Sequence, residues 1–449
     1  MNRKYRILIT LAMVMLSSKA FSQYENQPTG SAEVHVNAAQ AIAISVTNQP
    51  LIQAAEAAVS SARAKLGQAR SAYYPDISGM ASWDHVIPSE QKSLGEALFT
   101  LTPTDYWDFN VGADQLIYDF GKREFKVKLA KSGIDAALIN FNQIKTNIAF
   151  ETLRTFYSVL FLSEEVTSFD ERIANLERHR MDAENREKTG SSTHLDVLTT
   201  EVNVTMVKAD RIDVADQLER QKSRLRQLLG LNADAPLVAE GDFASDSMVG
   251  NASSLVEKAF KDRPDLLQAD NSVEMASLNK AIAALGNRPS ITAGAGIGFK
   301  NGLFTVDITD INALQFSWNV GVVLNVPIFD GFLAANKTSE AAGNLAAAKN
   351  EAEDIKRTIA SQVLQAIRSL AASRSRVENS VDQLTQAKRA LDIAKAQYEL
   401  GVVTNLQYLD SQTSLELAML NRLNALYKKA LSEVDLEQAV GEEIWKTGT

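Results

Sequence analysis

Four short segments of the chain alternate between apolar residues and polar or small ones. The clearest runs from Trp107 to Asp114, and residues 314–322 follow the same period. Residues 291–299 alternate as well, with glycine or threonine on the polar side, and residues 76–86 are the least regular. A period of two over about ten residues, with aromatic residues on the apolar side, is typical of membrane-spanning strands. Soluble hairpins that pack on helices show the same pattern, so the alternation by itself leaves both alternatives open.

Long stretches without proline separate these segments and predict long helices. Proline is absent from residues 104–235 and from 328–449, so nothing forces a helix to break there. The predicted helices are residues 122–188, 193–229, 333–399 and 404–440. The longer two have about 67 residues each, or roughly 100 Å, and the shorter two about 37, near 55 Å. An ordinary globular domain does not hold a helix of that length, so a rod or a tube is expected.

Apolar positions on the second long helix are spaced as in a coiled coil. They step by three and four residues, which places them on one seam that faces a partner helix. The seam comprises Leu384, Ala387, Leu391, Ala394 and Tyr398. Gly190 and Gly401 follow the long helices and are expected to form tight turns between antiparallel helices.

The chain contains two copies of one pattern. Gly190 and Gly401 are 211 residues apart, and so are Leu195 and Leu406. A constant offset of this size indicates a tandem duplication and not a short solenoid repeat. Each repeat is predicted to contain a helix, two strands, a long helix and a shorter helix. The expected boundaries are a first repeat at 23–230, a linker at 231–252, a second repeat at 253–441 and a tail at 442–449.

The first 22 residues have the pattern of a secretory signal peptide. Arg3, Lys4 and Arg6 precede an apolar run of about ten residues, and small residues before Gln23 supply a cleavage site. The run is too short for a membrane-spanning helix, which needs roughly 20 apolar residues. No later stretch has 18 uninterrupted apolar residues. An exported chain of this kind would enter a membrane by its strands.

Composition excludes several classes of protein. The 449 residues include no Cys, which excludes a disulfide framework, a thiolate nucleophile and an iron–sulfur centre. With 46 Lys and Arg against 55 Asp and Glu, the chain lacks the basic face of a nucleic-acid binder. The four His show no metal-binding spacing, and no nucleophile motif occurs. We therefore expect no enzyme, no cofactor and no metal.

The glycines at 294, 296 and 298 alternate, so they are interpreted as the small side of a strand and not as a phosphate loop.

Four strands cannot close a membrane barrel, because the smallest single-chain barrels have eight. Open strand edges cannot face lipid either, since their polar backbone groups would lack partners. A membrane interpretation therefore requires oligomerisation, and three chains with twelve strands form the natural solution.

The ordered motifs of both repeats resemble the TolC-type outer-membrane efflux factors over residues 30–440. The helices that precede the strands end at Tyr74-Pro75 and Arg288-Pro289, and the strands are followed by Ile117-Tyr118-Asp119 and Ile328-Phe329-Asp330. Gly190-x4-Leu195-Asp196 and Tyr398-x2-Gly401-x4-Leu406 lie at the predicted helical tips.

This resemblance implies an α+β membrane protein. It would combine a long α-helical, coiled-coil periplasmic barrel with a transmembrane β-barrel that trimerisation completes, four strands per chain and twelve in total. The homotrimer would lie in the outer membrane of a Gram-negative bacterium, with its tunnel in the periplasm and residues 231–252 in an equatorial belt. It would be the exit duct of a tripartite efflux or type I secretion system. Its partners would be a periplasmic adaptor (membrane-fusion) protein, an inner-membrane RND or ABC transporter and outer-membrane lipid.

The resemblance also implies functional residues at the tips. Asp196, Tyr398 and Asp410 match residues of the periplasmic entrance, or gate. The adaptor-contacting positions are Gly190, Leu195, Gly401 and Leu406. Val403 and Gln407 replace an arginine and an aspartate of the family pattern, which leaves a salt-bridge lock in doubt.

Helix capping is an alternative role for two of the tip residues. Thr193-x-x-Asp196 and Thr404-x-x-Gln407 both fit a capping box, whereas Asp410 lies beyond capping reach. At the level of the whole protein, the alternative is a secreted coiled-coil spacer or adhesin stalk without a channel. Such a stalk has no need of strand pairs at matching points of two helical repeats.

Overall fold

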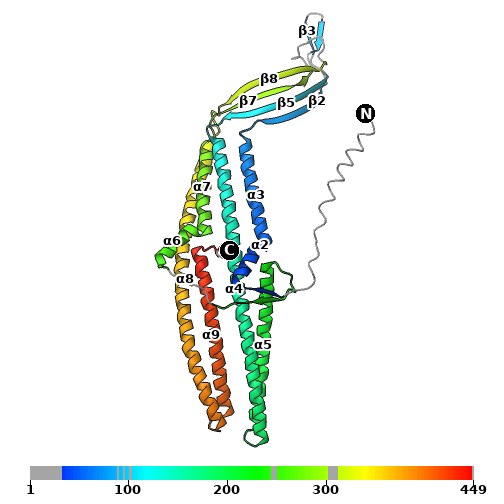
Figure 1. Ribbon diagram of the computed structural model, residues 1–449. Helices are drawn as coiled ribbons and strands as arrows, with labels where there is room; N and C mark the ends of the chain where they lie inside the picture. Colours follow the sequence, from blue (N-terminus) through cyan, green and yellow to red (C-terminus); the bar gives the residue numbers. More distant parts are fainter. Residues whose placement is uncertain are drawn as a thin grey trace, which may run out of the picture.

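The chain forms an elongated body with a twisted sheet at one end and paired helices that run away from it (Figure 1). The computed structural model describes residues 33–87, 91–94, 97–100, 104–243, 250–301 and 312–446. The predicted signal peptide, residues 1–22, lies outside the described residues. Within the described ranges, no helix has the length and apolar character needed to cross a membrane.

The two repeats are built from matching elements in the same order. The first contains α2 Ala38–Asn48, α3 Pro50–Ser71, β2 Asp76–His85, β5 Asp105–Tyr118, α4 Lys122–Lys188 and α5 His194–Leu229. The second contains α6 Ala252–Asp262, α7 Pro264–Ala284, β7 Ser290–Lys300, β8 Gln315–Asn325, α8 Leu333–Glu399 and α9 Asn405–Val440. Helices α4 and α8 have 67 residues each, and α5 and α9 have 36 each. The predicted long helices are thereby confirmed.

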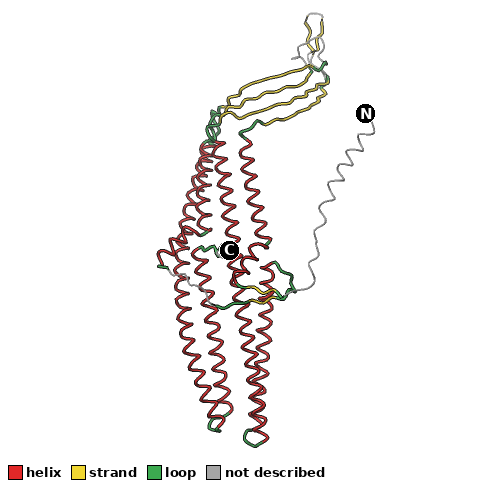
Figure 2. The backbone as a smooth tube through the Cα atoms, in the orientation of Figure 1, coloured by secondary structure: helices red, strands yellow, loops and turns green. Residues whose placement is uncertain are grey.

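In the described part of the chain, four short strands lie outside this duplicated pattern. They are β1 Val34–Val36, β3 Gln91–Leu94, β4 Ala97–Thr100 and β6 Leu237–Ala239. Strands β1 and β6 pair in parallel beside the middle of the helices, and β3 pairs with β4 in a hairpin beyond the sheet (Figure 2).

Local sequence signals set the ends of the helices. Pro50 and Pro264 occupy the first turns of α3 and α7, where the missing N–H has no intrahelical partner in any case. Gly230 and Gly441 end α5 and α9 with φ of 69° and 82°, a left-handed conformation that glycine adopts without strain. A Cβ at residue 441 would lie 3.0 Å from the Arg263 backbone nitrogen, so the chain also needs glycine there for close packing.

The helices pack side by side in two levels. Nearer the sheet, α3 and α7 lie against α4, and α7 also lies against α8. Farther from the sheet, α5 pairs with α4 and α9 pairs with α8, which gives two helical hairpins. Contacts of α4 with α7 and α9 join the two repeats. In the α8–α9 pair, Leu384 and Ala394 are buried and the other predicted seam residues are partly buried, so the coiled-coil seam is confirmed.

The main apolar core lies at mid-length, where α2, α4, α5, α9 and strands β1 and β6 meet. Its largest fully buried side chains include Phe150, Phe156, Leu225 and Leu229. The residues after α9 also join this core, because Ile444 is 8% exposed and the Trp445 Nε1–H donates to Thr146 Oγ1 at 3.2 Å. Glu442 forms an ion pair with Lys258. The docked tail therefore brings Glu442 against α6.

The sheet has the order β2-β5-β7-β8, and every neighbouring pair is antiparallel. Strands β2 and β8 are its two edges. The alternating segments of the sequence correspond to these four strands, so the strand prediction is confirmed.

Candidate functional sites on the sheet and at the helical tips

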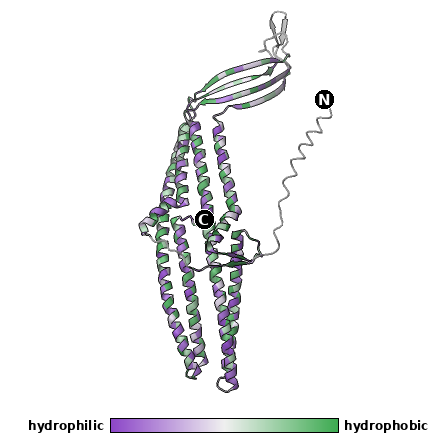
Figure 3. Cartoon of the chain, in the orientation of Figure 1, coloured by the Kyte–Doolittle hydropathy of each residue, from purple (hydrophilic) through white to green (hydrophobic). Residues whose placement is uncertain are grey.

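One face of the sheet carries continuous rows of apolar side chains. Phe109 of β5 is paired with Phe299 of β7, which is paired with Phe316 of β8. The next row on the same face joins Val111, Ile297 and Trp318. Hydrophobic and hydrophilic residues are interspersed along the strands of the sheet (Figure 3). The apolar side chains are exposed in the isolated chain, with Trp318 at 69% and Val320 at 72%. Such a face needs an apolar surrounding outside the chain.

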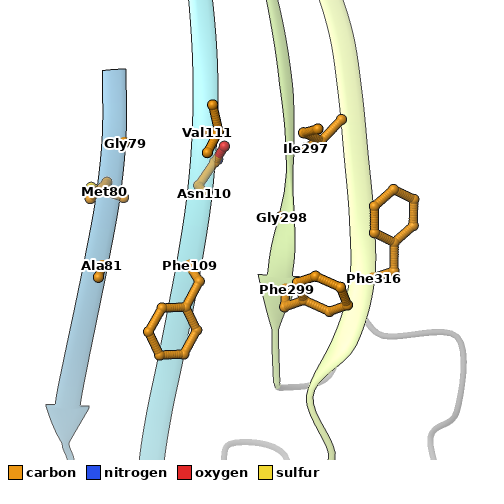
Figure 4. Close-up of a pocket in the computed structure, with 10 residues that line it drawn as sticks. All are labelled: Gly79, Met80, Ala81, Phe109, Asn110, Val111, Ile297, Gly298, Phe299 and Phe316. Carbon is orange, nitrogen blue, oxygen red and sulfur yellow. The ribbon is translucent and has the colours of Figure 1, made fainter. Parts of the chain in front are cut away.

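A shallow hollow of about 440 Å³ lies on this apolar face. Phe109, Phe299 and Phe316 border it, and Gly79 and Ala81 of β2 leave the space open (Figure 4). Asn110 is the one amide among the residues that line the hollow, and a single polar side chain does not orient a ligand, so the hollow gives no argument for a specific binding site.

The opposite face of the sheet is polar and crowded with small residues. A Cβ at residue 294 would lie 2.7 Å from Asp114 Oδ1, and one at residue 296 would lie 2.7 Å from Asn319 Oδ1. Glycine leaves room for these side chains to fold over β7, and at residue 298 it is required, because a Cβ there would overlap the backbone carbonyl oxygen of Phe109. The interpretation of the alternating glycines as the small side of a strand is confirmed.

The two helical hairpins end in turns of the same design. Gly190 and Gly401 have φ of 75° and 72°, the left-handed conformation expected after a helix. Thr193 and Thr404 cap the next helices, each in a complete capping box with Asp196 and Gln407. Both predicted capping boxes are confirmed. Leu195 and Leu406, in the first turns of α5 and α9, are 70% and 59% exposed.

The Asp196 carboxylate is engaged in its own cap. Its Oδ2 accepts hydrogen bonds from the Thr193 N–H at 2.9 Å, the Thr193 hydroxyl at 2.8 Å and the Ser192 hydroxyl at 3.0 Å. Partial burial alone would raise the pKa of Asp196, but the hydrogen bonds from Thr193 and Ser192 outweigh it and lower the pKa. Asp196 is therefore ionised at neutral pH.

Gln407 caps the first turn of α9 with an amide, as Asp196 caps α5 with a carboxylate. Its Oε1 accepts from the Thr404 N–H at 2.9 Å and from the Thr404 hydroxyl at 3.2 Å. The amide thus satisfies the helix end without adding a charge at the tip of the second repeat.

Four side chains from three helices meet just inside the tips, and we call them the tip joint: His179 of α4, Tyr398 of α8, and Asn405 and Tyr408 of α9. Tyr398 and Tyr408 are stacked with ring centroids 5.3 Å apart. The His179 ring lies 5.4 Å from Tyr398 and 4.6 Å from Tyr408. Arg186 covers Tyr398, with its guanidinium carbon 4.8 Å from the ring centroid. The tip joint is one of the places where the two hairpins touch.

The predicted entrance residues are only partly brought together. Tyr398 belongs to the tip joint, and Asp196 contacts the joint through its backbone carbonyl, which accepts from the Asn405 amide at 3.2 Å. Asp410 lies on an exposed face of α9 and is not part of the joint.

Sequence reasoning missed two elements of the contact between the hairpins. One is His179, which continues the buried line of Leu176 and Ala183 on α4, and this spacing is the signal that could have identified it. The other is an ion pair between Arg172 Nε and Glu416 Oε2 at 2.5 Å, with side chains 19% and 14% exposed. Across the described ranges, no group of three or more His, Asp or Glu residues converges as a metal site would require.

Comparison with known proteins places these features in a family context. The family model described as outer membrane efflux protein matches residues 41–231 and 255–442, which covers both repeats.

Individual relatives match at lower identity. The outer membrane protein TolC of Vibrio cholerae is 26% identical over 299 residues, 65% of this chain and 65% of that protein. The pyoverdine export outer membrane protein OpmQ of Pseudomonas aeruginosa is 23% identical over 428 residues, 93% of this chain and 82% of that one. A crystal structure of CusC has the same fold, with a TM-score of 0.78 at 19% identity over 94% of this chain and 96% of CusC.

Proposed function

This chain belongs to the outer membrane efflux protein family, and from that premise we propose that it is a channel that exports substrates across the periplasm and the outer membrane. It is the exit duct of a tripartite efflux or type I secretion system. It lies in the outer membrane of a Gram-negative bacterium, with the long helices in the periplasm. Members of this family are channels and not enzymes.

The observation that carries the proposal is the exposed, open-edged sheet. Its apolar face matches the lipid-facing side of a barrel and its polar face the side that lines a lumen. Because neighbouring strands alternate in direction from β2 to β8, the β8 edge of one copy can pair antiparallel with the β2 edge of the next. Three copies would close twelve strands, which leaves no strand edge to face lipid.

The helices extend the duct into the periplasm in this proposal. Residues 231–252 belong to an equatorial belt between repeats at 23–230 and 253–441, and they include β6, which pairs with β1. The tips form the entrance, where Asp196, Tyr398 and Asp410 act as gate residues. Gly190, Leu195, Gly401 and Leu406 contact a periplasmic adaptor, whose own partner is an inner-membrane RND or ABC transporter. The exposed Leu195 and Leu406 side chains support such a contact.

Membership of the family argues against the secreted stalk. A coiled-coil spacer would also have to cover the apolar face of the sheet, yet Trp318 and Val320 are exposed.

The mass of the complex tests the proposal most directly. The protein would be extracted with detergent from an outer-membrane fraction and measured by light scattering, with the detergent contribution subtracted. We expect a particle of three chains in the membrane fraction. A soluble monomer or dimer would contradict the channel and favour the secreted coiled-coil stalk instead.

Asp410 gives a prediction about ion selectivity. Three-fold symmetry would turn its exposed carboxylate into a ring of three charges, and acidic rings favour cations in a narrow pore. We expect modest selectivity for K⁺ over Cl⁻ from the reversal potential in a KCl gradient across a lipid bilayer. Asp410→Ala is expected to reduce this selectivity and, by shortening three side chains at the constriction, to raise the antibiotic leak of the resting channel.

Asp410→Glu serves as the control, because it keeps the charge and is expected to retain cation selectivity. If the original protein conducts K⁺ and Cl⁻ equally, the prediction that Asp410 forms a cation-selective ring is wrong. If Asp410→Ala changes neither selectivity nor leak, Asp410 has no role in the gate.

A further inference from the structure

The hydrogen bonds of the tip joint form a chain of donors and acceptors across the two hairpins, in which His179 donates to Asn405 and Asn405 donates to groups of α5. Asn405 is 4% exposed, and its Nδ2 donates to the Asp196 carbonyl at 3.2 Å and to Thr200 Oγ1 at 3.4 Å. Since the amide nitrogen is turned toward α5, the amide oxygen must act as the acceptor on the other side. It lies 2.7 Å from His179 Nε2, so the imidazole donates from that nitrogen. His179 of α4 is thereby linked through α9 to the backbone of α5.

Because of the position of Asn405, this link fixes the start of helix α9. Asn405 is the first residue of α9 and follows the capping residue Thr404, so a bond to its side chain holds the start of the helix. Tyr398, in the last turn of α8, holds the other helix of the same hairpin, because its ring stacks on Tyr408 and contacts the His179 ring at a tilt. Both sides of the α8–α9 turn therefore contact one imidazole on α4.

Charged groups surround the joint, and Arg186 covers Tyr398, but the four members of the joint contact one another as neutral groups. Asp182 and Arg186 face His179 from α4, and Asp196 faces it from α5. From α8 and α9 the facing groups are Tyr398, Tyr408 and Asn405.

Burial keeps the three titratable rings of the joint neutral. It lowers the pKa of His179, although the Asn405 hydrogen bond and the two nearby carboxylates act in the opposite direction. Burial also raises the pKa of Tyr398 and of Tyr408. The imidazole and both phenols are therefore uncharged at neutral pH.

We propose that His179 is the residue that latches the two helical hairpins of each chain together at the tip, through a neutral hydrogen bond to Asn405 and through its two tyrosine contacts. The role of this latch in closing the entrance depends on the proposed channel function. The latch is consistent with the two positions at which the tip departs from the family pattern. Val403, in place of an arginine, carries no charge, and the amide of Gln407, in place of an aspartate, is used in the Thr404 cap. A salt bridge is not required there when a buried imidazole joins the hairpins.

The latch should weaken in acid. A His whose pKa is lowered in the closed joint prefers the neutral form there, so closure is fully favoured only above its ordinary pKa of about 6.5. Closure loses this stability as the pH falls from that value toward the lowered pKa, because protonation would place an imidazolium among buried rings.

Spin labels can measure the latch without any assumption about conduction. The chain has no Cys, so labels at Ser191 and Val402 would report only the separation of the two turns. Excess unlabelled protein would be mixed in, so that each assembly carries one labelled chain. We expect one narrow distance distribution at pH 7.5 and a broader one at pH 5. In His179→Phe, which keeps a ring but loses the donor, we expect the narrow distribution to be lost at both pH values.

Two further variants keep the test falsifiable. His179→Gln retains an N–H donor without a titratable ring, so it should restore the narrow distribution and remove its pH dependence. His194→Phe is the matched control, because this exposed His pairs with Glu187 outside the joint. If His179→Phe leaves the distribution narrow, or if His194→Phe broadens it equally, the latch is wrong. Absence of conductance by the original protein in a bilayer would instead overturn the channel function, and the distances would still decide the latch.

Discussion

Val320→Arg is expected to remove the protein from the outer membrane. Val320 lies on the apolar face of edge strand β8 and is 72% exposed in the isolated chain. In a membrane barrel an arginine on the lipid face costs about 2–4 kcal/mol near the midplane. Three chains would bear this cost together, about 6–12 kcal/mol per trimer. Membrane fractionation followed by electrophoresis without heating should show loss of the trimer band.

Gly321→Arg provides the matched control one residue further along the strand. A side chain at residue 321 meets open space on the polar face, and its backbone is not in a left-handed conformation. We expect the trimer to form and its single-channel conductance to fall, because a long cation then projects into the lumen. If both arginine variants assemble equally well, or if Gly321→Arg alone fails, the assignment of the two faces is wrong.

Arg172→Met is expected to lower the free energy of unfolding by about 3–5 kcal/mol, because it leaves the Glu416 carboxylate buried without its partner. Arg172 Nε and Glu416 Oε2 are 2.5 Å apart between α4 and α9, the same pair of helices that the latch joins. Urea unfolding of the detergent-solubilised protein, followed by circular dichroism, would measure the loss. The double variant Arg172→Met/Glu416→Leu should recover most of it, since an apolar pair of similar volume leaves no charge to bury.

The loss should depend on pH in a defined direction. Burial raises the pKa of Glu416 from 4.5 to about 7, even though Arg172 acts to lower it. A carboxyl group with a raised pKa in the folded state favours the protonated form, so the folded protein loses stability as the pH rises through this window. Without Arg172 the pKa of Glu416 should rise further, and the variant should be least destabilised in acid. An equal loss at pH 5 and pH 8, or no recovery in the double variant, would contradict this account.

The sequence was sufficient to predict the long helices and the strands. Helix α4 begins after Gly121 and ends at Lys188, as the absence of proline and the position of Gly190 indicated. The strands were predictable because alternation with period two is local information. The capping boxes at Thr193 and Thr404 were also predictable, since each is specified within four residues.

The contacts between helices could not be predicted in the same way. A heptad pattern places a residue on a buried seam but does not identify the partner helix. His179 and Asn405 are 226 residues apart, and only the packing of α4 against α9 brings them together. The docking of Trp445 against Thr146 is equally non-local. For these residues the sequence gives the chemistry of the side chain and leaves its neighbour unspecified.

The unpaired edges of the sheet have a consequence for the kinetics of biogenesis. If the protein is the proposed trimer, a newly exported chain would present β2 and β8 as free edges, and its final fold would depend on encounters with two identical chains. Native yield should therefore rise more steeply than in proportion to the rate of synthesis, because the stability of such an assembly depends on subunit concentration. Chains made slowly would wait longer as monomers, exposed to periplasmic proteases and to mispairing with other strands. For such a trimer, the amount of functional protein in a cell would depend on the rate of synthesis as well as on the sequence.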